Sequence, residues 1–206
     1  GKGSLGRRLA KELGMEYLDT GKLYCYVGPK LMQSDINVKK AENHKSKEAA
    51  YAVEIARDIK LNDIDVADLQ GDGVAMAASI VSAIPDVRKA LLEFQREVAA
   101  SENGAVLDGR DIGTVVCPDA DFKFFITANV EIRAERRYKE LQKQGNDGIY
   151  TSVLEDLKER DKRDSLRSIS PLRPASDAIY IDTTALDIDE VLKEVLAKIK
   201  SSKKFK

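Results

Sequence analysis

Short apolar runs separated by longer amphipathic stretches organise this chain. The runs are rich in aromatic and β-branched residues or stop at glycine or aspartate, as is typical of strands. They lie at residues 17–18, 105–107, 121–127 and 179–182. Apolar positions recur at helical spacing at residues 5–13, 130–144, 151–168 and 188–199. This alternation predicts a parallel sheet with helices on both faces, and the run at 105–107, ended by glycine, predicts a buried parallel strand.

The stretch between residues 22 and 100 is mostly helical in its apolar spacing. An alanine-rich helix is predicted at 74–84, and Pro85 then opens a second amphipathic helix. Residues 37–47 are rich in lysine and predict an exposed connection, and residues 61–68 are irregular. Because no linker rich in proline, glycine or serine bounds this stretch, we expect a lobe inserted into one domain.

Composition narrows the function classes. The 34 basic and 35 acidic side chains nearly cancel, so the chain has no global field for nucleic acid or an anionic membrane. No apolar run is long enough to span a bilayer. Cys25 and Cys117 form no disulfide framework, which favours a cytoplasmic protein. The single histidine, His44, argues against a histidine–cysteine metal site and against a Ser-His-Asp hydrolase.

Candidate chemistry begins with the sequence DGRDIGTVV at residues 108–116, directly after a predicted strand. Ligands of open α/β sheets bind at the carboxyl ends of the strands. Arg110 and Asp111 placed there can bind an anion and a hydrogen-bond donor of one ligand. An ordinary salt-bridged turn would have the same residues, so this stretch alone leaves both interpretations open.

A second candidate is the glycine-rich start of the chain, Gly1, Lys2, Gly3 and Ser4, which runs directly into an amphipathic helix. Backbone N–H groups at a helix start bind phosphate oxygens, and a lysine reaches them from the side. We expect the strand and the first glycines of a GxxxxGK motif to precede Gly1 in the natural protein. A remnant of an expression tag is the alternative for these four residues.

Charged side chains on two later helices are the third candidate. Arg133, Arg136 and Arg137 share one helical face, and they either bind phosphate or form a solvated basic face paired with neighbouring glutamates. In the next helix Arg160, Asp164 and Arg167 form one stripe, although alternating charges also occur on ordinary solvated helices. Near the start, Asp19 and Thr20 either cap a helix or belong to a site.

Taken together, these stretches resemble the bacterial cytidylate kinases, a family of P-loop nucleoside monophosphate kinases. The matching segments follow in the family's order over nearly the whole chain. They are GKGS at 1–4, LDTG at 18–21 with Tyr24, AS at 78–79 with PDVR at 85–88, DGRDIGTVV at 108–116, RAERRY at 133–138, RDKRD at 160–164 continuing to Arg167, PLRPASDA at 171–178 and IDT at 181–183. The resemblance implies a three-layer P-loop kinase fold with a central parallel sheet. It also implies one domain, with an inserted NMP-binding lobe at about 36–100 and a helical lid at about 144–165.

The same resemblance implies transfer of the γ-phosphoryl group of ATP to CMP or dCMP, with Mg²⁺ bridging the ATP phosphates and no metal held by protein ligands alone. Its implied ATP contacts are Gly1, Lys2, Gly3 and Ser4. Its implied acceptor contacts are Arg110 for the phosphate, Thr20, Asp111, Arg88 and Arg167 for the base, and Ser79, Arg160 and Asp164 for the sugar. Lys2 and Arg110 would act in catalysis together with Arg133 and Arg137, which would close over the ATP phosphates.

This chain departs from the family in two segments: near residues 22–25, and at residues 37–73, which match the family poorly. Cys25 stands where the family usually has arginine, and Lys22 stands where it usually has a small residue. Two alternatives therefore stay open: the same fold acting on UMP, AMP or a small hydroxy acid, and a nucleotide-binding protein without catalysis. We expect a monomer whose partners are ATP and CMP or dCMP, with neither nucleic acid nor a membrane as partner.

Overall fold

The computed structural model describes residues 2–34, 37–60, 73–143, 145, 148–166 and 170–202. The chain divides into two compact units. The middle unit is Glu16–Gly109, and the terminal unit combines Gly1–Met15 with Arg110–Lys206. Each unit has helices and one pair of parallel strands, which confirms the predicted α/β class. No helix within the described ranges is long and apolar enough to cross a membrane.

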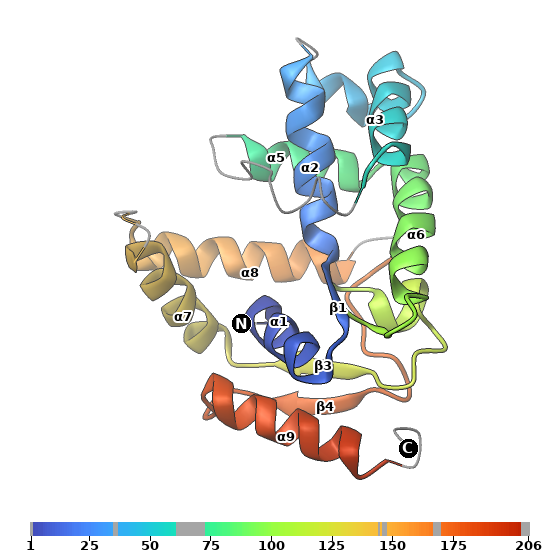
Figure 1. Ribbon diagram of the computed structural model, residues 1–206. Coiled ribbons are helices and arrows are strands. Elements are labelled where there is room, and N and C mark those ends of the chain that lie inside the picture. The colour runs from blue at the N-terminus through green and yellow to red at the C-terminus, as the bar shows by residue number, and fades with distance from the viewer. Residues whose placement is uncertain are drawn as a thin grey trace. The chain divides into compact units, whose positions relative to one another are not determined.

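In the middle unit two short strands pair in parallel. Strand β1 (Glu16–Asp19) lies beside β2 (Ala105–Asp108), with Glu16 opposite Ala105 and Asp19 opposite Asp108. The helical elements between them are α2 (Thr20–Gln33), the 3₁₀ helix η1 (Val38–Glu42), α3 (Lys47–Arg57), α5 (Val74–Ser82) and α6 (Pro85–Ala99) (Figure 1). The mostly helical character predicted for residues 22–100 is therefore confirmed for the described part of that stretch.

The core of the middle unit follows directly from the helical spacing of its apolar residues. Leu23, Val27 and Leu31 lie at every fourth position of α2 and are fully buried. On α6 the same spacing buries Val87 and Leu91. Burying each such side chain contributes about 1.5–3 kcal/mol, so these two stripes account for much of the stability of this unit.

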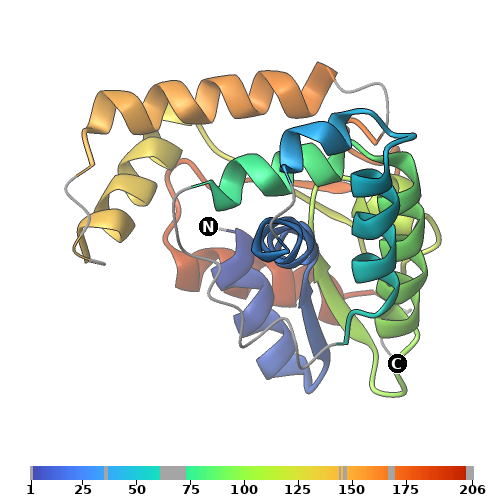
Figure 2. The same ribbon diagram turned by 90° about the horizontal axis from the view of Figure 1, so that it is seen from above.

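Helix α5 runs across α2 at a very close approach (Figures 1 and 2). The contact is at Gly28, where an added Cβ would lie 2.7 Å from the carbonyl carbon of Ala77 and 2.7 Å from the backbone nitrogen of Ala78. Only glycine lets the two helix backbones approach so closely at this position.

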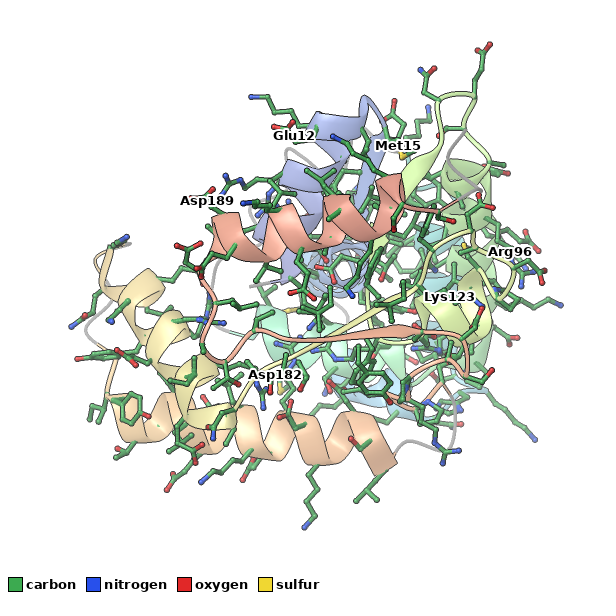
Figure 3. The ribbon with its side chains drawn as sticks, turned by 90° about the horizontal axis from the view of Figure 1, so that it is seen from below. Glu12, Met15, Arg96, Lys123, Asp182 and Asp189 are labelled. Carbon is green, nitrogen blue, oxygen red and sulfur yellow. The ribbon has the colours of Figure 1, made fainter. Side chains whose placement is uncertain are left out.

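The terminal unit contains the second parallel pair. Strand β3 (Phe124–Thr127) lies beside β4 (Ile179–Asp182), with Phe124 opposite Ile179 and Thr127 opposite Asp182. Its helical elements are α1 (Lys2–Leu13), a single π-helical turn η2 (Ile112–Val116), α7 (Val130–Lys143), α8 (Tyr150–Leu166) and α9 (Ile188–Lys200). Figure 3 marks Lys123 and Asp182 at opposite ends of the strand pair.

Helices α1 and α9 pack against each other, and each has buried apolar side chains, among them Leu5 and Val195. Beyond α1, Gly14 has φ +66°, and the Met15 N–H donates to the Ala10 carbonyl at 2.9 Å. This left-handed glycine ends the helix in a Schellman motif. At the start of α9, Asp187 and Glu190 form a capping box. Capping interactions therefore fix the end of α1 and the start of α9.

The structure differs from the sequence-based expectations in four places. The helix predicted from residue 5 includes Lys2, Gly3 and Ser4 in its first turn. The connection at 37–47 was predicted to be exposed, but it contains η1, in which Val38 and Ala41 are buried. Strand β2 is half-buried along its length rather than buried. The four strands form two separate parallel pairs within the described residues. The irregular stretch predicted at 61–68 lies outside those residues.

Candidate active site

The first group of predicted site residues lies at the start of α1. Lys2 and Ser4 are exposed in the first turn of this helix, and Gly3 lies between them. The first N–H groups of a helix have no partner within the helix, and they bind anions together with the positive end of the helix dipole. This turn can therefore hold phosphate oxygens. Gly1 lies outside the described residues.

The segment after Arg110 is fixed by its backbone. The Asp111 carbonyl accepts from the N–H groups of Val115 at 2.8 Å and Val116 at 3.2 Å, which closes the π-helical turn η2. Such turns are rare in proteins and occur frequently at functional sites. Gly113 lies against the side chain of Lys123, with 3.1 Å between an added Cβ and Cδ. The Lys123 ammonium in turn donates to both carboxylate oxygens of Asp177, at 2.8 and 2.9 Å.

A buried carboxylate forms the centre of the charged residues in the terminal unit. Only 3% of the Asp164 side chain is exposed, and it accepts a hydrogen bond from Nε of Arg110. Nε of Arg160 lies 4.0 Å from the same carboxylate. A buried charge is costly unless an opposite charge balances it, and the arginines supply that balance. The structure thus brings together Arg110, Arg160 and Asp164, while Arg167 lies outside the described residues.

The three arginines predicted to share a face of α7 reach three different partners. Arg133 donates two hydrogen bonds to Asp161 on α8, at 2.7 and 3.2 Å. Arg136 donates to the carbonyls of Thr183 and Leu186, at 2.7 and 3.0 Å. Arg137 pairs with Glu140 on the same helix at 2.8 Å. Arg136 therefore joins α7 to the loop after β4. The side chains of Arg133 and Arg137 are partly exposed.

The loop after β4 is shaped by the carboxylate of Asp182. One of its oxygens accepts from the Thr184 hydroxyl at 2.6 Å and from the Thr184 N–H at 2.9 Å. The hydrogen bond from the hydroxyl, which has the larger effect, and the bond from the N–H together lower the pKa of Asp182 below that of an ordinary aspartate. The Thr184 hydroxyl also accepts from the Asn129 N–H at 2.9 Å, so the loop is held at the carboxyl ends of both β3 and β4.

We predict that Thr184→Val raises the pKa of Asp182 toward the ordinary aspartate value, whereas Thr184→Ser keeps it low. A lowered pKa in the folded state stabilises the fold above the unfolded pKa, and that contribution is lost as pH falls through the folded pKa. Carboxyl carbon NMR titration of the three proteins measures the change directly. An unchanged titration in Thr184→Val would contradict the role given to the hydroxyl.

In the middle unit the predicted base and sugar contacts lie on α2, α5 and α6. Thr20 is buried, and its hydroxyl donates to the Asp108 carbonyl at 2.9 Å, which ties the start of α2 to the end of β2. Arg88 donates to the Ser82 carbonyl at 3.2 Å and lies 5.5 Å from the centre of the Tyr24 ring. Ser79 is exposed on α5, one turn before Ser82.

Sequence reasoning gave no role to several residues that hold the predicted site residues in place. Tyr24 lies under Arg88, Asp161 binds Arg133, and Lys123 supports the turn after Arg110. Tyr24 is matched together with the LDTG segment, three residues after its end, and Asp161 lies within RDKRD, so both positions could be identified in the sequence. Their partners could not, because Asp161 and Arg133 are 28 residues apart.

Parallel strand pairs, a lysine in the first turn of a glycine-rich helix and arginines around a buried carboxylate are together typical of phosphate-transferring α/β enzymes. A sequence model of the family described as "Cytidylate kinase" matches residues 1–201. The cytidylate kinase of Paramagnetospirillum magneticum is 50% identical, over 98% of this chain and 94% of the relative. That of Methylocella silvestris is 46% identical, over 98% and 90%. The chain belongs to the cytidylate kinase family.

Proposed function

We propose residue roles for an enzyme whose reaction follows from its family. The enzyme transfers the γ-phosphoryl group of ATP to CMP or dCMP and releases ADP with CDP or dCDP. The observation that carries this conclusion is the family match over residues 1–201, with relatives of 44–50% identity along nearly the whole chain. Phosphoryl transfer needs little covalent chemistry from the protein, because positioning and charge neutralisation supply most of the rate.

On the ATP side, we assign Lys2 and the N–H groups of Gly1, Gly3 and Ser4 to the phosphates. Exposure of Lys2 and Ser4 in the first turn of α1 supports this assignment. Arg133 and Arg137 neutralise charge on the transferred phosphoryl group. Arginine suits the task because its planar guanidinium donates two parallel hydrogen bonds to phosphate oxygens and stays charged.

Magnesium fits a site of this kind. Mg²⁺ keeps several waters and usually binds through substrate phosphates with one or two protein oxygens. Among the described residues, no group of three histidine, cysteine, aspartate or glutamate side chains converges on one point. The Ser4 hydroxyl would contact the ion. When bound, Mg²⁺ would neutralise charge on the phosphates and orient them.

On the acceptor side, we assign Arg110 to the phosphate of CMP. The base would contact Thr20, Asp111, Arg88 and Arg167. The sugar would contact Ser79, Arg160 and Asp164. Support comes from the charge and position of these groups: Arg88 is oriented by Ser82 and Tyr24, and Asp164 is a buried acceptor between two arginines. An acceptor such as Asp111 favours the amino group of cytosine over the carbonyl of uracil.

We further propose the three-layer P-loop kinase arrangement, with the NMP-binding lobe at about 36–100 and the lid at about 144–165. Family membership and the parallel pairing of strands support the arrangement, and the helix pair α7–α8 supports a lid. The enzyme acts as a cytoplasmic monomer in this proposal, which agrees with its balanced charge and with its two cysteines, which form no framework.

The test of the function is a coupled assay of ADP release by the full chain with ATP and Mg²⁺. We expect strong turnover with CMP and dCMP and much weaker turnover with UMP and AMP. Preference for UMP or AMP would instead support the same fold with another acceptor. Absence of turnover with every monophosphate, while ATP still binds, would support a nucleotide-binding protein without catalysis.

Lys22 offers a separate prediction about the position where this chain departs from the family. Lys22 and Cys25 lie three residues apart on α2 and therefore on one face of that helix. We propose that Lys22 supplies the positive charge that the family's arginine supplies at position 25. Lys22→Ala is expected to raise the KM for CMP several-fold, and Cys25→Arg added to Lys22→Ala is expected to restore it. A KM for CMP that Lys22→Ala leaves unchanged would contradict this role.

A further inference from the structure

The guanidinium group of Arg133 is held from two sides within the terminal unit. Its Nε donates to the carbonyl of Ala128 at 3.0 Å, directly after the carboxyl end of β3. Its two terminal nitrogens donate to the two carboxylate oxygens of Asp161 on α8, at 3.2 and 2.7 Å. A fork of two parallel bonds fixes the plane of a guanidinium as well as its position.

We propose that Asp161 is a positioning residue that presents Arg133 to the phosphates of ATP. The inference rests on the role proposed above for Arg133. A guanidinium has five N–H donors, and these contacts with Ala128 and Asp161 use three of them. One N–H remains on each terminal nitrogen of Arg133, and each can donate a hydrogen bond to a phosphate oxygen without breaking the bonds of Arg133 to the protein. Preorganised donors of this kind stabilise developing charge without a reorganisation cost during the reaction.

Asp161 is not required to hold α7 and α8 together. The Tyr138 and Tyr150 rings meet edge to face with their centroids 6.0 Å apart, and Lys158 lies 4.0 Å from Glu131. The side chains of Arg133 and Asp161 are 32% and 41% exposed, and ion pairs that are accessible to water contribute little to stability. Its geometric effect on Arg133 is therefore its main consequence.

Arg137 provides the contrast on the same helix. It makes a single hydrogen bond to Glu140, one turn along α7, and half of its side chain is exposed. A single bond between two flexible side chains leaves the direction of the guanidinium undefined. Of the two arginines assigned to ATP, Arg133 is thus the one whose orientation the protein determines.

The test compares Asp161→Asn with the wild-type enzyme in steady-state kinetics. An amide accepts one of the two bonds but cannot complete the fork, so kcat/KM for ATP should fall about 10-fold. The KM for CMP should stay within twofold, and the thermal midpoint should change little. Asp161→Glu, which keeps the carboxylate, should recover part of the loss. Glu135→Gln is the matched control, because Glu135 lies on α7 and pairs only with exposed Lys139 among the contacts described for it.

A double-mutant cycle with Arg133→Lys separates positioning from a general effect on the fold. If Asp161 acts through Arg133, Asp161→Asn should cause little further loss in the Arg133→Lys background. An equal loss in both backgrounds would overturn the proposal, as would an Asp161→Asn enzyme that matches or exceeds the wild type. If the wild-type enzyme does not turn over CMP, the proposed function fails. The role of Asp161 is then tested by the affinity of the wild-type and Asp161→Asn proteins for ATP, measured by calorimetry. We expect Asp161→Asn to bind ATP several-fold more weakly, and equal affinities would overturn the proposal.

Discussion

Replacing Arg110 with methionine is expected to lower kcat/KM for CMP by about 100- to 1,000-fold, because the charged donor that we propose for the acceptor phosphate is lost. The same change should lower the free energy of unfolding by about 3 kcal/mol. It removes a hydrogen-bonded, positively charged partner of Asp164, whose side chain is 3% exposed and whose carboxylate lies 4.0 Å from Nε of Arg160. Coupled assays and urea denaturation measure the two effects on one protein.

A second substitution separates the lost phosphate contact from the loss of stability. Asp164→Asn added to Arg110→Met removes the buried charge that has lost one of its positive partners, so the free energy of unfolding should recover while activity stays low. Arg110→Lys is the complementary variant, because it keeps the charge but cannot donate the fork of two bonds. Full activity of Arg110→Met, once allowance is made for its folded fraction, would contradict the role of Arg110 at the acceptor phosphate.

The helices were predictable because local spacing determines which of their faces is buried. Leu23, Val27 and Leu31 recur every fourth residue, and this period alone identifies the buried face of α2. Pro85 at the first position of α6 marks its start in the sequence. The connection at 37–47 was misjudged because its many lysines obscured the buried pair Val38 and Ala41.

The charged partners were less predictable because they depend on tertiary structure. The stripe of Arg160 and Asp164 on α8 could be read from its spacing, and the structure has both on that helix. The hydrogen-bonded partner of Asp164 is Arg110, 54 residues earlier, which no helical period reveals. Likewise, helical spacing placed Arg133, Arg136 and Arg137 on one face, but side-chain length and neighbouring elements send them to three partners.

Strand pairing shows a third limit of the sequence. The apolar runs identified all four strands of the described residues, and each strand begins and ends within three residues of its predicted bounds. Strand β3 begins at Phe124, whereas the strand predicted from the sequence begins at residue 121. Which strands pair is a non-local property, so local patterns predicted parallel pairing without specifying β1 with β2 and β3 with β4.

Gly28→Ala is expected to destabilise the middle unit by about 2 kcal/mol, although helix propensity alone predicts the opposite sign. In an open helix, alanine is more favourable than glycine by about 1 kcal/mol. Here the new Cβ would lie 2.7 Å from backbone atoms of Ala77 and Ala78, so the crossing of α2 and α5 must open. Overpacking of this kind costs about 1–3 kcal/mol, and sometimes more.

Two further variants make the Gly28 prediction specific. Ala77→Gly should not rescue Gly28→Ala, because removing the Ala77 Cβ, 2.9 Å from the added atom, leaves the closer backbone contacts in place. Gly148→Ala is the matched control, since its nearest atom, Cδ1 of Leu141, is at an ordinary 3.9 Å. Urea denaturation should show a loss for Gly28→Ala alone and in combination, and almost none for Gly148→Ala. A gain in stability for Gly28→Ala would mean that α2 and α5 do not cross at backbone contact. Thr20 and Lys22, which we assign to substrate, lie on α2. Something other than the crossing of α2 and α5 would then have to hold them in position.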